Sequence, residues 1–381
     1  MKIAVAIDSF KGSLSTFECA DAVEAAAKRV FSGVTVEKCP LADGGEGTVR
    51  AIVSATGGKL VNKEVCGPLG DRVIAEYGIL PEKKTAVIEM AAAAGITLVE
   101  EAKRDPMITT TYGVGELIRD AIETHGARKF IVGIGGSATN DGGTGMLSAL
   151  GFEFLDESGK PIPHGAKGLA DLKDIRTEHA LPALSDCEFL VACDVNNPLC
   201  GERGCSAVFG PQKGATPNTV KLMDASLSAF AALTGRVLGA SHENDAGAGA
   251  AGGLGFAFLS YLSGKLTPGV TLVMDATSLY EKIKDADLVV TGEGRLDGQT
   301  VMGKAPIGVA KAAKKYGKTV IAFAGCVTED AVLCNENGID AFFPILRAPI
   351  SLSDAMNKEN AYKNLMNTAE QAFRLYKAAN Q

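Results

Sequence analysis

The sequence predicts an α/β protein of two domains: a doubly wound, flavodoxin- or Rossmann-like parallel-sheet domain with a second, mixed α/β domain inserted into it. Three observations support this prediction. The chain has 381 residues, more than most single domains contain. Its residues are 46% hydrophobic but only 6% aromatic, with no Trp, so the core must consist mainly of Ala, Val, Ile and Leu, as in parallel sheets. Strand-like and helix-like segments also alternate at both ends of the chain.

The N-terminal segment begins with an apolar run, Lys2 to Ile7, that predicts a buried strand. A turn containing Asp8 and Lys11 follows, and apolar residues at helical spacing then predict a helix from Thr16 to Phe31. Residues 33–58, GVTVEKCPLADGGEGTVRAIVSATGG, repeat this plan. The resulting β-α-β-α order is typical of one half of a parallel sheet.

The C-terminal segment returns to the same rhythm: ADLVVTGEG, KTVIAFAG and GIDAFFPI predict strands, and PIGVAKAAKKYG predicts a helix. Residues 59–91 differ, because short strand-like runs there are separated by Gly/Pro turns. We therefore expect a discontinuous doubly wound domain of residues 1–60 plus 265–381, and an inserted domain of residues 61–264. The active site is expected in the cleft between the two domains.

Composition excludes several classes of function. A formal net charge of −7 argues against a nucleic-acid partner, because Lys/Arg clusters supply most of that affinity. No apolar run is long enough to span a bilayer, so no membrane partner is expected. The nine cysteines are scattered, and Cys193, Cys200 and Cys205 match no common zinc spacing. We interpret this pattern, with a strand-like N-terminus, as that of a cytoplasmic protein, which could be a homodimer.

The segment from Lys129 to Gly151 passes from an apolar strand-like run into glycines and small polar residues, and then into apolar residues at helical spacing. A turn of this kind leaves backbone N–H groups unpaired at the start of a helix, where phosphate binds readily. The alternative is a tight strand-to-helix connection whose glycines serve packing alone. Asp141 is the acid of this turn that could hold a metal ion. The predicted phosphate-binding residues are Gly135, Gly136, Ser137, Thr139, Asn140, Gly142 and Gly143.

Five polar, glycine-rich loops follow strand-like runs, at residues 8–15, 41–48, 133–143, 193–201 and 291–306. In α/β sheets, loops at the carboxyl ends of strands form the ligand-binding crevice. Carboxylates beside cations suit phosphoryl transfer, in which acids serve Mg²⁺ and the attacking hydroxyl while cations serve phosphate charge. Any single acid could instead be a cap or turn residue, as Asp8 before Ser9 suggests. The charged residues of these loops include Lys11, Asp43, Glu46, Asp141, Asp194, Glu293, Arg295, Asp297 and Lys304.

Two regular motifs nearly occur in the chain. Residues 298–306, GQTVMGKAP, have the spacing of a Walker A loop, but Ala305 stands where Ser or Thr would ligate magnesium. Residues 247–252, GAGAAG, fit a dinucleotide fingerprint, but the polar SHEND before them cannot be the strand that this motif requires. The four histidines are dispersed, and no hydrolase triad or zinc motif is evident.

Four segments together resemble the type I glycerate kinase family of bacteria: IDSFKGSLS, PLADGGEGT, GIGGSATNDGGTGMLSALG and TGEGRLDGQT. They occur in the family's order and extend from residue 7 to about residue 310, so that the resemblance covers nearly the whole chain. It implies ATP-dependent, Mg²⁺-dependent phosphorylation of D-glycerate. It also implies a two-domain α/β architecture distinct from that of P-loop kinases, which agrees with the incomplete Walker A motif.

Chemistry then suggests roles for the loop residues. The turn from Gly135 to Gly143 would hold the ATP phosphates, with Asp141 and Glu293 near the metal ion. Arg295 and Lys11 would bind the glycerate carboxylate and the transferring phosphoryl group. The remaining catalytic role, orienting and deprotonating the attacking hydroxyl, would fall to one of two acids, Asp194 or Asp297.

Two other functions remain open at this point. One is an NAD-dependent oxidoreductase of a small hydroxy acid, although the first loop, DSFKGS, lacks the G-x-G-x-x-G pattern. The other is a non-catalytic two-domain sensor of a small acid, which would need no metal-binding carboxylates. For the kinase, the product is expected to be 2-phospho-D-glycerate, with 3-phospho-D-glycerate as the alternative.

Overall fold

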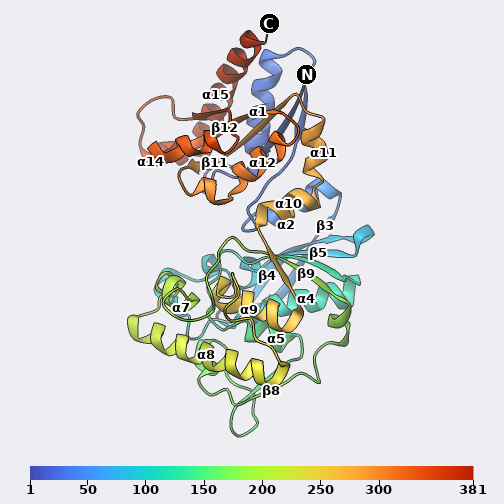
Figure 1. Cartoon of the computed structure of the whole chain (residues 1–381), viewed down its shortest axis with the longest axis vertical. Coiled ribbons are helices and arrows are strands. Elements are labelled where there is room, and N and C mark those ends of the chain that lie inside the picture. Colours follow the sequence, from blue (N-terminus) through green and yellow to red (C-terminus); the bar gives the residue numbers. More distant parts are fainter. Residues whose placement is uncertain (381) are drawn as a thin grey trace. The chain divides into compact units, whose positions relative to one another are not determined.

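The computed structural model describes residues 1–380, which divide into two compact units (Figure 1). Unit 1 comprises Met1–Asp43, Ser54–Thr56 and the residues from Val270 to the C-terminus. Unit 2 comprises Gly44–Val53 and Gly57–Gly269. The domain limits expected from the sequence, near residues 60 and 265, stay predictions.

Unit 1 is built on a five-stranded parallel sheet in the order β13-β12-β11-β1-β2. This is the strand order 2-1-3-4-5 of flavodoxin-like sheets, counted along unit 1. The predicted doubly wound parallel sheet is therefore confirmed. Its strands are β1 (Lys2–Ile7), β2 (Thr35–Lys38), β11 (Leu288–Leu296), β12 (Thr319–Val327) and β13 (Ala341–Pro344).

Helices pack on both faces of this sheet. On one face, α1 (Thr16–Val30) and α15 (Lys358–Ala379) pack against each other and form a core with alternate residues of β1 and β11, such as Val5 and Val290 (Figure 1). The residues between these belong to the opposite face, where α12 (Ala305–Lys314) packs. The other helices of this part of the chain are α10 (Gly269–Ala276), α11 (Leu279–Lys284), α13 (Leu333–Glu336) and α14 (Leu352–Met356).

Unit 2 contains a six-stranded mixed sheet in the order β10-β9-β6-β5-β4-β3. The first four of these strands run parallel, and the β5–β4 and β4–β3 pairs are antiparallel. This confirms the predicted mixed α/β architecture. The strands are β3 (Lys59–Cys66), β4 (Arg72–Leu80), β5 (Thr85–Glu89), β6 (Lys129–Gly133), β9 (Glu188–Ala192) and β10 (Lys265–Thr267), and β7 (Glu153–Leu155) pairs separately with β8 (Asp174–Arg176).

The core of unit 2 is apolar and partly aromatic, with the rings of Phe130 and Phe189 stacked at 4.8 Å between centroids. Helix α2 (Thr48–Thr56) begins in unit 2, and its last three residues are assigned to unit 1. The other helices of unit 2 are α3 (Ala91–Ala94), α4 (Tyr112–His125), α5 (Thr144–Ala149), α6 (Ala166–Leu169), α7 (Cys205–Phe209), α8 (Pro217–Leu238) and α9 (Ala250–Leu262). The short 3-10 turns of the chain include η5 (Pro211–Lys213) in unit 2 and η6 (Thr300–Met302) in unit 1.

Gly143 caps the start of α5 with a positive φ of 77°, and a Cβ atom there would lie 2.4 Å from the Cβ of Ala257. Gly159 has a similar φ of 74°, but a Cβ atom there would have no neighbour within 4 Å. We expect Gly159→Ala to cost about 1 kcal/mol through backbone strain, and Gly143→Ala to cost about 1–3 kcal/mol more through overpacking.

Urea unfolding of both variants measures this difference. Equal losses of stability would show that the close packing around Gly143 contributes nothing.

Candidate active site

Asp8 is the first residue after β1 and is only 6% exposed. Its Oδ1 accepts a hydrogen bond of 2.7 Å from the backbone N–H of Ser9. Burial, together with the nearby Asp43 and Glu293 carboxylates, raises the pKa of Asp8 to about 7, although this hydrogen bond and Lys11 oppose the rise. A carboxylate with a pKa near neutrality can exchange a proton at physiological pH, as a general base must.

Asp43 lies in the loop after β2 and forms an ion pair with Lys11, with 3.0 Å between Nζ and Oδ2. The Lys11 side chain is 71% exposed, so this pair adds little to stability but places an exposed cation beside Asp43 and near Asp8. Lys11 therefore has the position and charge to contact an anionic ligand.

Glu293 lies on β11 and is half-buried, with Oε1 accepting a hydrogen bond of 2.7 Å from the hydroxyl of Thr300 in η6. Burial raises the pKa of Glu293. Because β1 and β11 are neighbouring parallel strands, Asp8 and Glu293 lie at the same carboxyl edge of the sheet. We call Asp8, Lys11, Asp43 and Glu293 the switch-point cluster, since in this strand order ligands bind where the winding reverses, at β1 and β11.

Arg295 and Asp297 lie near the end of β11 and interact with each other, with 3.2 Å between Nε and Oδ2. Lys304 approaches the other carboxylate oxygen at 3.7 Å, and the backbone N–H of Gln299 donates to that oxygen at 3.0 Å. Both oxygens of Asp297 are thus in use, whereas the Arg295 side chain is 63% exposed. The geometry suits Asp297 to orienting neighbouring groups more than to accepting a proton.

The glycine-rich turn of unit 2 follows β6. Gly135 and Gly136 are exposed at its tip, whereas Ser137 is 7% exposed. The backbone approaches closely here, because a Cβ atom on Gly133 would lie 2.2 Å from the carbonyl oxygen of Gly44. The loops at residues 41–48 and 133–143 were both singled out from the sequence, and this contact joins them within unit 2.

The remaining residues of the turn are interior. Thr139 and Asn140 are fully buried, and Gly142 and Gly143 are buried as well. The Asn140 Nδ2 donates to the hydroxyl of Ser206 at 2.9 Å. These residues shape the turn, and the phosphate-binding role expected for them stays a prediction.

Asp141 is fully buried, and its carboxylate accepts hydrogen bonds from Thr111, Gly143 and Gly145. Burial raises the pKa of Asp141, while these hydrogen bonds oppose the rise. The carboxylate ties the start of α4 to the start of α5, so the geometry gives it a structural task. Its expected role as a metal ligand stays a prediction.

Asp194 is exposed just after β9, in unit 2, and its Oδ1 accepts a hydrogen bond of 3.0 Å from the backbone N–H of Gly269. The residue thus stands at the carboxyl end of a parallel strand, as the sequence suggested. Its catalytic role stays a prediction.

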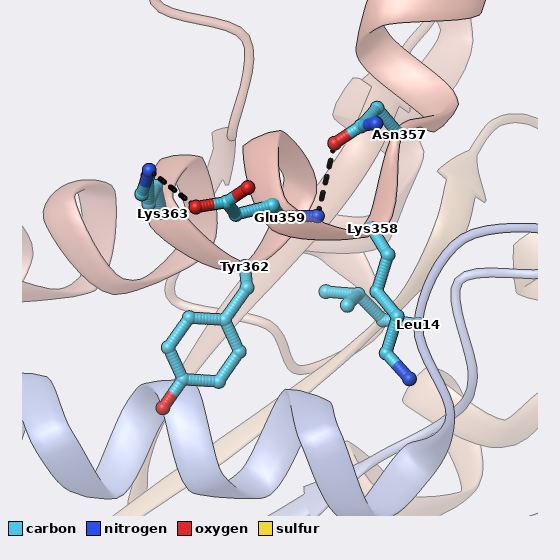
Figure 2. Close-up of a pocket in the computed structure, with 6 residues that line it drawn as sticks. All are labelled: Leu14, Asn357, Lys358, Glu359, Tyr362 and Lys363. Carbon is cyan, nitrogen blue, oxygen red and sulfur yellow. Dashed lines mark hydrogen bonds and ion pairs between the residues drawn. The ribbon is translucent and has the colours of Figure 1, made fainter.

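A pocket of about 440 Å³ lies in unit 1 beside α15, lined by Leu14, Asn357, Lys358, Glu359, Tyr362 and Lys363 (Figure 2). Two of the residues that line the pocket, Glu359 and Lys363, form an ion pair at 2.9 Å, so their charges compensate each other. None of the charged loop residues singled out from the sequence lines this pocket. The candidate catalytic groups are therefore the charged residues of the loops and not those of this pocket.

Within residues 1–380, no group of three or more His, Cys, Asp or Glu side chains is arranged to hold a metal ion without further ligands. Mg²⁺ in nucleotide-dependent enzymes is commonly held by one or two carboxylates together with substrate phosphates, so a complete protein cage is not required. Over the same residues, no helix has the length and apolar character needed to cross a membrane.

The fold and its loops define a class: an α/β enzyme with carboxylates and cations at the switch point of a parallel sheet and no Walker A loop, as expected for a phosphotransferase outside the P-loop group. The sequence model of the Glycerate kinase family matches residues 3–377. The chain belongs to the glycerate kinase family, which confirms the resemblance found in the sequence.

Individual relatives agree with this assignment. The chain is 51% identical to the glycerate kinase of Haemophilus influenzae, over 98% of both chains. It is 47% identical to the glycerate 2-kinase of Escherichia coli, over 96% of this chain and 95% of the relative. A crystal structure assigned to a glycerate kinase 2 of Salmonella typhimurium LT2 superposes with a TM-score of 0.91 at 47% identity, covering 100% of this chain and 99% of that one.

Sequence reasoning assigned no role to Asp8 and did not single out Lys213, which is described below. Asp8 could have been found, because it directly follows the first strand, where a parallel sheet places ligand contacts. Lys213 gave no signal, since nothing in the segment PQKGA indicates that its lysine is buried.

The pKa of Asp8 is higher in the folded state than the ordinary value of 3.8 for an aspartate, so folding favours the protonated form. The stabilisation is complete below about pH 3.8 and is lost as the pH rises through about 7. We therefore expect Asp8→Asn to gain stability relative to the parent protein as the pH rises from 4 to 8.

Thermal unfolding at several pH values measures this, with Asp285→Asn, an exposed residue of unit 1, as the control. A constant difference in Tm between Asp8→Asn and the parent over this range would mean that Asp8 is not perturbed.

Proposed function

We propose that the protein is a glycerate kinase that transfers the γ-phosphoryl group of ATP to a hydroxyl of D-glycerate, giving 2-phospho-D-glycerate and ADP. Membership of the glycerate kinase family supports the reaction, and the glycerate 2-kinase relative supports the 2-hydroxyl over the 3-hydroxyl. The observation that carries the proposal within the molecule is the switch-point cluster, which places acids and a cation where this fold binds ligands.

The reaction forms a bond between the glycerate oxygen and the γ-phosphorus, and breaks the bond between that phosphorus and the bridging oxygen of ADP. The hydroxyl proton must go to a base. We propose Asp8 as this base, because burial beside other carboxylates raises its pKa to about 7, so that its ionised form can take up the proton near neutral pH. Asp297, in the same unit, then serves to orient the hydroxyl, and the catalytic role expected for Asp194 stays a prediction.

Lys11 and Arg295 supply positive charge at the same edge of the sheet. Lys11 presents a single ammonium group, which suits the transferring phosphoryl group. The guanidinium of Arg295 presents a planar fork, which suits a carboxylate such as that of glycerate. Both side chains are largely exposed, so each can reach a ligand without leaving a buried partner unpaired.

We propose Mg²⁺ as the metal ion, with Glu293 as its protein ligand in unit 1. The half-buried carboxylate beside Asp43 is a hard oxygen donor in a negative environment, which fits this ion. When bound with ATP, Mg²⁺ would neutralise phosphate charge. Gly135, Gly136 and Ser137 are the proposed contacts of the ATP phosphates, because they form the outer part of the glycine-rich turn.

We propose that the protein acts in the cytoplasm. Its nine cysteines are free, as expected in that reducing compartment. Assembly as a homodimer stays a prediction.

The activity itself is directly measurable. Purified protein with ATP, Mg²⁺ and D-glycerate should release ADP and form 2-phospho-D-glycerate, identified by ³¹P and ¹³C NMR of the product, and EDTA should abolish the reaction. Formation of 3-phospho-D-glycerate would correct the position of transfer. Absence of ADP at saturating substrates would contradict the kinase proposal, and NAD⁺ reduction with glycerate would favour the oxidoreductase instead.

The three carboxylates are expected to differ in their effect on kcat. Asp8→Asn should lower kcat by about 100-fold or more, since a general base contributes 10²–10⁴-fold. Asp297→Asn should lower kcat by about tenfold, because an orienting residue acts through geometry alone. Asp194→Asn tests the catalytic role that the sequence predicts for that residue.

Steady-state kinetics with Asp285→Asn as the control measures these effects. If Asp8→Asn keeps kcat within about threefold of the parent, which is under ~1 kcal/mol of barrier, Asp8 is not the base. A larger loss for Asp194→Asn would transfer the role to that residue.

A further inference from the structure

Lys213 ends the turn η5 and is only 2% exposed. Its ammonium group donates to the hydroxyl of Ser137 at 2.7 Å and to the backbone carbonyl of Thr139 at 2.6 Å. The lysine thus reaches the glycine-rich turn from the inside of unit 2. Two of its three donors are used in these contacts.

The surroundings of Lys213 compensate its charge only in part. None of the carboxylates in residues 1–380 forms an ion pair with it. Two titratable groups face it: Asp141, whose oxygens already accept hydrogen bonds from the turn, and Cys205 of α7. Burial raises the pKa of Cys205 to about 11, so this thiol is neutral at physiological pH. Desolvation correspondingly lowers the pKa of Lys213 to about 8.

A second contact joins the same segments, because Asn140 donates to Ser206 at the start of α7. Two polar atoms of the turn, the hydroxyl of Thr139 and the Oδ1 of Asn140, are buried without a hydrogen-bond partner. The middle of the turn is therefore held by Ser206 and Lys213, yet its hydrogen bonding is incomplete. Buried polar atoms without a hydrogen-bond partner lower the stability of the fold unless another group binds to them.

A purely structural lysine is the simpler interpretation. It is disfavoured by energy, since burying a lone ammonium group costs more than burying an apolar side chain of the same size. Placement also argues against it, because Ser137 is bonded to Lys213 and directly follows the exposed Gly135 and Gly136. The charge lies beneath the part of the turn where we place the phosphates.

We propose that Lys213 is a positioning residue for nucleotide binding, which holds Ser137 and Thr139 in place and lends the turn a positive charge for a phosphate group of ATP. This inference rests on the proposed function. It assigns the nucleotide phosphates, and not the glycerate carboxylate, to the turn of unit 2.

The test measures binding by calorimetry, with Mg²⁺ and a non-hydrolysable ATP analogue in one series and D-glycerate in another. Lys213→Met removes the charge at similar volume, and Lys221→Met on the exposed side of α8 is the control. At pH 7, Lys213→Met should bind the analogue about tenfold or more weakly and glycerate within about twofold of the parent, because a lost charge-assisted hydrogen bond has an effect of this size. Lys213→Arg should recover part of the loss.

The pH dependence of analogue binding separates a positioning role of Lys213 from a general loss of structure. For the parent, affinity for the analogue should fall as the pH rises from 8 to 9.5 and Lys213 loses its proton, whereas Lys213→Met should show no such fall. Folding stability should move the other way: the depressed pKa means that the unfolded chain binds more protons, so the parent gains stability relative to Lys213→Met between pH 8 and 10.

Ser137→Ala provides a second variant if Lys213→Met does not fold. It keeps the charge, so it should weaken analogue binding several-fold while retaining the parent's pH dependence. Equal analogue binding by Lys213→Met and the parent, or a loss confined to glycerate, would overturn the inference. These outcomes concern binding, so they remain distinct from a failure of the parent to form phosphoglycerate, which would contradict the proposed function.

Discussion

The constraint on which unit 1 depends is the crowding of carboxylates at the carboxyl edge of its parallel sheet. Parallel pairing of β1 and β11 brings Asp8 and Glu293 to one edge, and the loop after β2 adds Asp43. Like charges in a poorly hydrated place disfavour ionisation, so Asp8 retains a proton up to near neutral pH. The fold thereby holds several carboxylates in an electrostatically unfavourable arrangement. A bound metal ion or an added proton would reduce the repulsion between them, which makes the arrangement useful for catalysis.

In unit 2, the main constraint is that the glycine-rich turn must be held in one conformation. The turn has little apolar surface of its own, so polar groups fix it. Asp141 accepts hydrogen bonds from backbone and hydroxyl donors, and Lys213 donates to Ser137 and Thr139. The same low-dielectric interior that strengthens these hydrogen bonds makes the unpaired atoms of Thr139 and Asn140 expensive. A rigid turn with residual charge is well suited to binding anions.

Much of the fold could be predicted from the sequence, because periodicity reports which faces are buried. The strand Lys2–Ile7 was predicted with its bounds, and the helix after it differs by one residue at its C-terminal end. The loops of the site were also found, since glycines and acids after strands are local signals. Burial was not predictable: Asp141, whose expected role as a metal ligand stays a prediction, and Lys213, which the sequence did not single out, both lie in the interior. Such differences depend on contacts between segments far apart in the chain.

We propose that glycerate reacts at the switch-point cluster. A crystal structure with Mg²⁺, ADP and D-glycerate would test this proposal. We expect a glycerate hydroxyl within about 3.2 Å of the Asp8 carboxylate, the reach of a general base. Glycerate bound away from Asp8, for example in the pocket beside Tyr362, would contradict it.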